Sequence, residues 1–249
     1  MPRFFVTPRQ IDGDTITITG QDVNHISHVL RMAPGDNLTV SDGSGMDYYC
    51  SITSFDRDAV RLSVIDRWAS FVELPAKITL FQGLPKGEKM ELIIQKAVEL
   101  GAARIVPVAM ARTIVKLDEK KREKRIRRWQ SIAESAAKQA GRALIPEVTD
   151  IVSFSGALDL CREMDAALMP YEKAAGMDEA RQLIGGLHDK KNIGILIGPE
   201  GGFDPSEVLA AEAAGVKTMT LGHRILRTET AGMTMLSIMM FELEEDQND

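Results

Sequence analysis

The stretch Ile193–Phe203, which reads IGILIGPEGGF, most constrains the fold of this chain. Its first six residues, Ile193–Gly198, are mostly apolar and predict a short buried strand. A helix is expected after it, because Asp204 can cap a helix, Pro205 suits its first position and Glu207 its third. A strand, a glycine turn and a capped helix leave backbone N–H groups free at the carboxyl edge of a sheet, where open α/β folds bind ligands.

The glycine loop matches neither of the two common phosphate-binding motifs. It lacks the Gly-Lys-Ser/Thr ending of a P-loop and the G-x-G-x-x-G spacing of a dinucleotide turn. Taken alone, it is as compatible with an ordinary strand-to-helix turn as with a ligand site. A second loop, Leu221–Thr230 (LGHRILRTET), follows the apolar strand expected over Val216–Leu221 and precedes an apolar helix. The two loops together favour a ligand site.

The composition is that of an ordinary globular protein. Its 249 residues, 44% hydrophobic and 27% charged, suit one large or two modest domains. The net charge of −6 argues only weakly against a nucleic-acid partner, because basic residues can be clustered. Cys50 and Cys161 show no metal-ligand spacing and are expected to be reduced core thiols of a cytoplasmic chain. We expect no membrane association, because the longest apolar run, Met233–Phe241, is too short to span a bilayer.

Residues 1–70 predict a small β-rich domain. The alternation in Thr15–Thr19 is typical of a half-buried strand. Further strands are expected over Asn37–Ser41, Tyr48–Phe55 and Ala59–Arg67, and short strands of this kind usually close into a small barrel. One helix is expected over Asp22–Met32, with an apolar face made by Val23, Ile26, Val29 and Leu30.

Residues 74–249 predict an α/β domain with a parallel sheet. A strand over Lys77–Gln82, an amphipathic helix over Glu88–Leu100 and a strand over Arg104–Met110 form one βαβ unit. The alternation continues with helices over Asp118–Ala140, Ser155–Met164 and Asp178–Leu187, and with strands over Glu147–Thr149 and Ala166–Met169.

GPEGGF at residues 198–203 and LG-x-RILRTETA at residues 221–231 closely resemble motifs of the RsmE family of SPOUT methyltransferases. Further matches are NHISHVLRM at residues 24–32, Lys96-x-x-Glu-Leu-Gly and the run RWQSIAESAAKQAGR that ends at Arg142. The resemblance implies a PUA-like RNA-binding β-barrel followed by a SPOUT domain with a trefoil knot. It also implies transfer of a methyl group from S-adenosylmethionine (SAM) to N3 of a uridine in 16S rRNA of the small ribosomal subunit, by a homodimer packed through the C-terminal domain.

The resemblance also implies which residues contact SAM. They belong to three loops: Met169 and Pro170; Gly198, Pro199, Glu200 and Gly201; and Leu221, Gly222, Ile225, Leu226 and Arg227.

Methyl transfer to N3 of uracil needs a proton acceptor or a group that stabilises the anion, because N3 is a poor nucleophile while it carries its proton. The candidates are Arg227 as charge stabiliser and Glu229 as base or as orienter of the arginine, in a place where water is scarce. The alternative is an Arg–Glu pair that only braces the loop. No metal is needed, and His25 and His28 lack an evident third ligand.

Basic residues are concentrated in the helix expected after Asp118. Eight of the thirteen residues from Lys116 to Arg128 are Lys or Arg. They form either a solvated face with intrahelical ion pairs or a stripe that faces RNA phosphates. With the family resemblance, we expect RNA contacts from Arg3, Arg9, His25, Arg31, Lys86, Arg112 and Arg142.

Two other functions remain open from the sequence. One is a non-catalytic RNA-binding or ribosome-assembly protein with a degenerate methyltransferase domain. The other is a different α/β enzyme that uses the glycine loop for a nucleotide phosphate. SAM binding argues against the first, and preference for SAM over ATP or NAD argues against the second.

Overall fold

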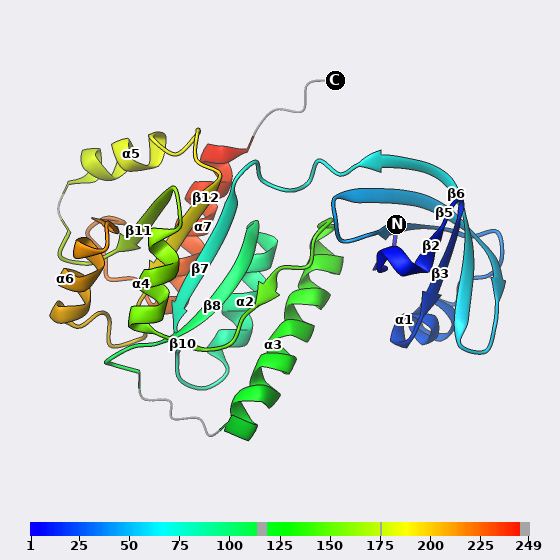
Figure 1. Ribbon diagram of the computed structural model, residues 1–249, viewed down its shortest axis with the longest axis horizontal. Coiled ribbons are helices and arrows are strands. Elements are labelled where there is room, and N and C mark those ends of the chain that lie inside the picture. Colours follow the sequence, from blue (N-terminus) through cyan, green and yellow to red (C-terminus); the bar gives the residue numbers. More distant parts are fainter. Residues whose placement is uncertain (114–118, 175, 245–249) are drawn as a thin grey trace. The chain divides into compact units, whose positions relative to one another are not determined.

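The computed structural model describes residues 1–113, 119–174 and 176–244. Contacts divide the chain into two units (Figure 1): Met1–Glu73 with Ala137–Ile145, and Leu74–Ala136 with Pro146–Asp249. The short segment Ala137–Ile145, expected in the C-terminal domain, therefore groups with the first unit. In the part of the chain that the structure describes, no helix has both the length and the apolar character needed to cross a membrane.

The first unit is a curled, mixed sheet of six strands in the order β1-β4-β5-β6-β3-β2. Only the β1–β4 pair is parallel within this sheet. The strand bounds are Arg3–Phe5 (β1), Ile11–Asp12 (β2), Thr15–Thr19 (β3), Asn37–Ser41 (β4), Met46–Phe55 (β5) and Ala59–Ala69 (β6). The alternation expected for β3 is confirmed, because Ile16 and Ile18 are buried in the core while Thr15 and Thr19 are exposed.

The helix expected over Asp22–Met32 is shorter and less regular than the pattern predicts. It consists of α1, Gln21–Asn24, and a π-helical turn over His25–Val29. Ile26 is fully buried, but Val29 is 63% and Leu30 40% exposed, so the predicted apolar face is wrong at these two positions. The reason is the wider turn: Leu30 N donates to His25 O (2.9 Å), five residues back, which rotates later side chains away from a 3.6-residue repeat.

The second unit is a parallel sheet with helices on both faces, as expected. The strand order is β10-β8-β7-β12-β11-β13, and β9 also pairs with β8. The strands are Lys77–Gly83 (β7), Ala102–Ala109 (β8), Glu147–Val148 (β9), Val152–Ser153 (β10), Ala166–Pro170 (β11), Asn192–Ile197 (β12) and Lys217–Met219 (β13). The helices are Lys89–Glu99 (α2), Glu119–Ala140 (α3), Phe154–Arg162 (α4), Met177–Gly185 (α5), Pro205–Ala213 (α6) and Thr228–Leu243 (α7). The C-terminal end of α3, from Ala137 on, groups with the first unit.

Apolar side chains cover both faces of this sheet. Phe81, Val106 and Leu196 pack with α4 and α6 in one core cluster. On the other face α2 packs against α7, and Ile94 and Leu236 are buried there (Figure 1). The strands are therefore buried on both sides, which explains their continuous apolar runs.

Candidate functional site

The glycine loop between β12 and α6 forms a tight turn at the carboxyl edge of the sheet. Gly202 N donates to Pro199 O (2.9 Å), and Gly202 has φ +67°, a conformation that favours glycine. The helix cap is confirmed: Asp204 accepts from Ser206 N (3.0 Å), and Glu207 bonds back to Asp204 N (2.9 Å).

The end of β7 presses against this loop. A Cβ on Gly83 would lie 2.6 Å from Pro199 N, so only glycine permits this approach of two backbones. Beside it, Thr228 at the start of α7 donates its hydroxyl to Gly198 O (2.6 Å) and accepts from Gln82 Nε2 (2.8 Å). The glycine loop, β7 and α7 are thus joined by buried hydrogen bonds.

A cavity of about 450 Å³ opens where these elements meet. The glycine loop forms one wall, and Ile225, Leu226 and Arg227 form another. Pro170 at the end of β11 and Glu172 just after it contribute a third. Its volume is in the range of small-molecule sites, roughly 300–1,000 Å³. Apolar side chains, backbone groups and carboxylates are all available to a ligand in it.

Most of the predicted cofactor residues meet in this cavity. They are Pro170, Gly198, Pro199, Glu200, Gly201, Ile225, Leu226 and Arg227. Three others do not line it. Met169 is fully buried in the core below, since successive residues of a strand point to opposite faces. Leu221 lines a separate hollow with Met177 and Ile238, and Gly222 (φ +107°) belongs to the turn before Ile225.

The structure does not pair Arg227 with Glu229, so the alternative of an Arg–Glu pair that only braces the loop is wrong for the described residues. Arg227 is exposed at the cavity wall, so the expectation of a water-poor position is wrong, and its guanidinium has no hydrogen-bond or ion-pair partner in residues 1–113, 119–174 and 176–244. Glu229 lies instead 3.5 Å from Lys89 Nζ, and its side chain is 14% exposed. The physical reason is the helix: Arg227 caps α7 while Glu229 is in its first turn, beside the start of α2.

Lys89 is a site residue that the sequence reasoning missed. Its Nζ lies 3.2 Å from Glu200 Oε1 and 3.5 Å from Glu229, so one cation joins the glycine loop to α7. Lys89 begins the helix that follows β7, and parallel strands end at one edge of a sheet. That rule would have placed the β7–α2 loop at the site.

The Glu200 carboxylate is held in its ionised form. Burial alone would raise the pKa of this group, but hydrogen bonds from its own and the Lys86 backbone N–H, together with Lys89, keep the pKa below its ordinary value. A fixed negative charge therefore lines the cavity.

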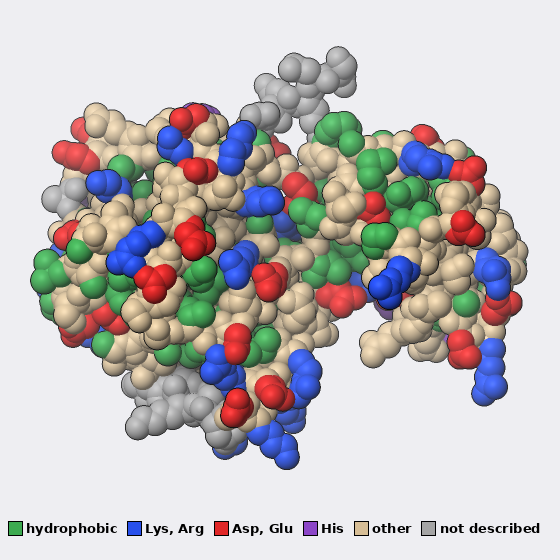
Figure 2. Space-filling view, in the orientation of Figure 1, with side chains coloured by type: hydrophobic (Ala, Val, Ile, Leu, Met, Phe, Trp, Pro, Cys, Tyr) green, Lys and Arg blue, Asp and Glu red, His purple; other side chains and the backbone are tan. Residues whose placement is uncertain are grey.

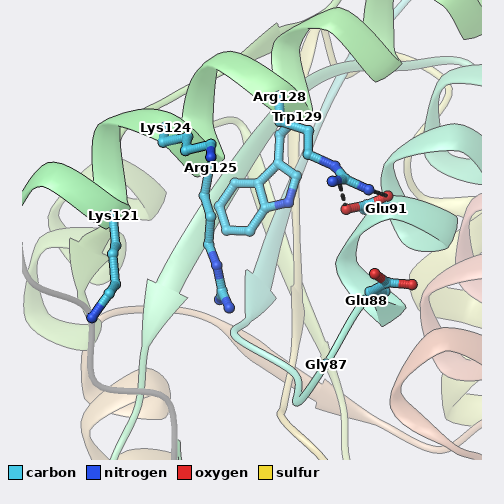
Figure 3. Close-up of a pocket in the computed structure, with 8 residues that line it drawn as sticks. All are labelled: Gly87, Glu88, Glu91, Lys121, Lys124, Arg125, Arg128 and Trp129. Atoms are coloured by element: carbon cyan, nitrogen blue, oxygen red, sulfur yellow. Dashed lines mark hydrogen bonds and ion pairs between the residues drawn. The ribbon is translucent and has the colours of Figure 1, made fainter.

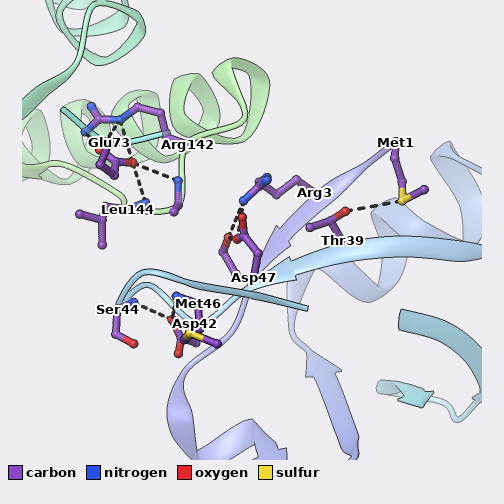
Figure 4. A network of polar contacts seen from close by, with 12 residues as sticks. Met1, Arg3, Thr39, Asp42, Ser44, Met46, Asp47, Glu73, Arg142 and Leu144 are labelled. Carbon is purple, nitrogen blue, oxygen red and sulfur yellow. Dashed lines mark hydrogen bonds and ion pairs between the residues drawn. The ribbon is translucent and has the colours of Figure 1, made fainter. Parts of the chain in front are cut away.

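Two of the residues expected to contact RNA, Arg3 and Arg142, make ion pairs within the first unit (Figure 4). Arg3 Nη1 donates to Asp47 (2.6 Å) and Ser41 (2.7 Å), and Asp47 is buried. Arg142 is 4% exposed and pairs with Glu73, whose carboxylate also accepts from Ala143 N (3.0 Å). Both guanidinium groups therefore make structural ion pairs within the fold, and their contact with RNA stays a prediction.

The other expected RNA-contact residues are exposed. Arg9, His25 and Arg31 lie on the first unit, where His25 contacts Phe4 edge to face. Lys86 and Arg112 lie on the second unit, and Arg112 Nη1 donates to Gly201 O (2.8 Å). Lys116, part of the basic run, lies outside the described residues. Among those described, no group of three His, Cys, Asp or Glu side chains has the arrangement of a metal site.

The cavity suits SAM on chemical grounds. The glycine loop offers backbone groups that a ligand can approach closely, and Phe203, Ile225 and Leu226 offer apolar surface to an adenine. The carboxylates of Glu172 and Glu200 suit a sulfonium cation.

Two family models match the chain. One, an RNA methyltransferase PUA domain, covers residues 18–65, and the other, an RNA methyltransferase domain, covers residues 72–240. With the parallel sheet and the cavity at its carboxyl edge, they place the molecule in the class of RNA methyltransferases.

Comparison with individual relatives identifies the family within this class of RNA methyltransferases. The chain is 38% identical to ribosomal RNA small subunit methyltransferase E of Bacillus subtilis, over 98% of both chains. It is 33% identical to the protein of that name from Mycobacterium bovis, over 94% of this chain and 88% of the relative. A crystal structure of the Neisseria gonorrhoeae ribosomal RNA small subunit methyltransferase E, bound to SAM, superposes with a TM-score of 0.83 at 33% identity over 97% of each chain. The chain belongs to the ribosomal RNA small subunit methyltransferase E family.

Proposed function

We propose that this protein transfers the methyl group of SAM to N3 of a uridine in 16S rRNA of the small ribosomal subunit, in the cytoplasm. The observation that carries the proposal is the cavity made by the glycine loop and by Ile225–Arg227, in a chain whose relatives include a methyltransferase crystallised with SAM. SAM supplies an electrophilic methyl group on a sulfonium centre, so the protein must position the acceptor and stabilise its charge.

Arg227 is proposed to act on the acceptor base. Its guanidinium lies at the cavity wall and has no ion-pair partner in the described part of the chain, so its charge is available to an incoming uracil. Loss of the N3 proton spreads negative charge over O2 and O4, and a forked donor can hold such an anion.

Glu229 is proposed to take the proton or to fix Lys89. Its Oε2 is buried without a hydrogen-bond partner, and its one described ion pair is with Lys89. An oxygen in that state can accept a proton, but Glu229 is not among the residues that line the cavity, so the contact with Lys89 is the better supported of the two roles.

The domain roles and the assembly are also proposals. Residues 1–70 would bind RNA through Arg9, His25 and Arg31, while residues 74–249 would hold SAM in a trefoil-knotted SPOUT domain.

The 84% exposed Phe241 and 36% exposed Ile238 of α7 support a homodimer packed through this domain. Light scattering tests the dimer: Phe241→Glu should give monomers, and a dimer that persists places the interface elsewhere.

Ligand binding and a deletion strain test the function. A thermal shift with SAM, absent with ATP or NAD, is expected. Mass spectrometry of rRNA nucleosides from a strain without this protein should show loss of 3-methyluridine, restored by the wild-type chain and not by Arg227→Ala. An unchanged nucleoside profile in the deletion strain refutes the proposed function.

A further inference from the structure

A second hollow, of about 280 Å³, lies between α3 and the start of α2. Lys121, Lys124 and Arg125 of α3 line one wall, and Gly87 and Glu88 line the other (Figure 3). The buried Trp129 lies beside them. We refer to it as the α3 groove. In Figure 2, Lys and Arg side chains are gathered, with some acidic ones, over the N-terminal half of α3.

The cations of α3 divide into two groups by their partners. Arg122 is bonded to Asp150 (2.6 Å), Arg127 lies 3.5 Å from Glu123, and Arg128 is bonded to Glu91 (2.8 Å). The side chains of Lys120, Lys124 and Arg125 have no hydrogen-bond or ion-pair partner among the described residues, and of these three only Lys124 and Arg125 line the α3 groove. The solvated-face interpretation of the basic run thus accounts for the paired cations and leaves these two unexplained.

The α3 groove and the SAM cavity share one loop. Gly87 and Glu88 line the groove, the next residue, Lys89, lines the cavity, and Lys86 N donates to Glu200 of the cavity (3.0 Å). Consecutive residues of one loop therefore line the two hollows.

We propose that the α3 groove binds the phosphodiester backbone of the rRNA strand next to the target uridine, with Lys124 and Arg125 as its phosphate contacts. The proposal rests on the proposed function. Phosphate contacts carry no sequence information, but they fix the position of the RNA strand along the protein. A strand in a fixed position brings the target uridine to the cavity in one orientation. Glu88 on the opposite wall repels phosphate and confines it to the α3 side.

Charge reversal with a matched control tests the groove. The variant Lys124→Glu/Arg125→Glu is compared with Lys120→Glu/Arg127→Glu, which makes the same charge change on the same helix at positions that do not line the groove. Binding of an rRNA fragment is measured at several salt concentrations, with SAM affinity as a second readout. Thermal melts verify that both variants fold.

The groove variant should bind RNA about 10-fold or more weakly than the control variant at ~0.1 M salt, and its salt slope should fall by about 1.4, for two phosphates on a single strand. SAM affinity should not change, and Glu88→Gln should tighten RNA binding. Equal losses in the two variants, or a Glu88→Gln variant that binds no tighter, would overturn the proposal. If the wild type binds and methylates rRNA in the same experiment, such a result counts against the groove and not against the proposed function.

Discussion

The Thr228 hydroxyl donates to Gly198 O at 2.6 Å and so fixes the first turn of α7 to the glycine loop. The hydroxyl oxygen of Thr228 also accepts a hydrogen bond from Gln82 Nε2. This hydroxyl oxygen therefore joins Gln82, Gly198 and Thr228, which are far apart in the sequence. It is buried, because Thr228 is 5% and Gln82 0% exposed. Loops that must hold a ligand between them depend on such a connection for their spacing.

Removal of this hydroxyl should loosen the cavity. Thr228→Val keeps the shape but leaves a buried amide N–H and the Gly198 carbonyl without this partner, at a cost of about 1–3 kcal/mol. We expect a lower melting temperature and SAM affinity about 10-fold weaker in calorimetry. Thr228→Ser keeps the hydroxyl and should bind SAM almost normally, so similar losses in both variants would show that the hydrogen bonds are unimportant.

Lys89 should couple the two carboxylates that it contacts. Lys89→Gln leaves Glu200 and Glu229 without their shared cation, so both the SAM affinity and the methylation rate should fall. Both should fall less in Lys89→Arg, which keeps the positive charge. A double-mutant cycle of Lys89→Gln with Glu229→Gln measures the pair directly. The coupling should be about 1 kcal/mol, since the lysine is partly exposed. Strict additivity would mean that the pair has no energetic effect.

The charge of Glu200 predicts a pH dependence. Its folded-state pKa is below the ordinary 4.5, so its contribution to stability is present above pH 4.5 and is lost as the pH falls through the folded-state pKa. Melting temperatures of wild type and Glu200→Gln, measured from pH 7 to pH 3, should therefore converge at the acid end. Curves that stay parallel over this range would contradict the assignment.

Arg227 should act on the reaction more than on binding. Lys keeps the charge and loses the forked geometry, so Arg227→Lys should slow single-turnover methylation nearly as much as Arg227→Ala, by about 100-fold, the lower end for the loss of one charge-stabilising donor. SAM affinity should remain within a few-fold, because the proposed interaction is strongest in the transition state. If Arg227→Ala methylates at the wild-type rate with both substrates saturating, Arg227 has no catalytic role.

Local sequence chemistry predicted the parts of the site that lie within single segments. The cap at Asp204 and the strand before Gly198 follow from local spacing, whereas the cavity-lining residues were expected from the resemblance to the RsmE family. Contacts between segments were not predictable in this way. Lys89 with Glu229, and Gln82 with Thr228, are brought together only by the strand order, which no local pattern contains.

The RNA contacts expected from the family resemblance at Arg3 and Arg142 fall on guanidinium groups that the fold already pairs. Arg3 and Arg142 match basic positions of the family motifs, but a buried or half-buried guanidinium is stable only when paired, and Asp47 and Glu73 supply the pairs. A sequence shows that an arginine is present and not whether an acid elsewhere in the chain has already bound it.

Reconstituted methyl transfer tests the central claim most directly. Purified protein, SAM carrying a deuterated methyl group and small-subunit rRNA are incubated, and the nucleosides are then analysed by mass spectrometry. The account predicts deuterated 3-methyluridine with the wild-type chain and strongly reduced label with Arg227→Ala. Label on another atom or another base, or no label despite measured SAM binding, would contradict it.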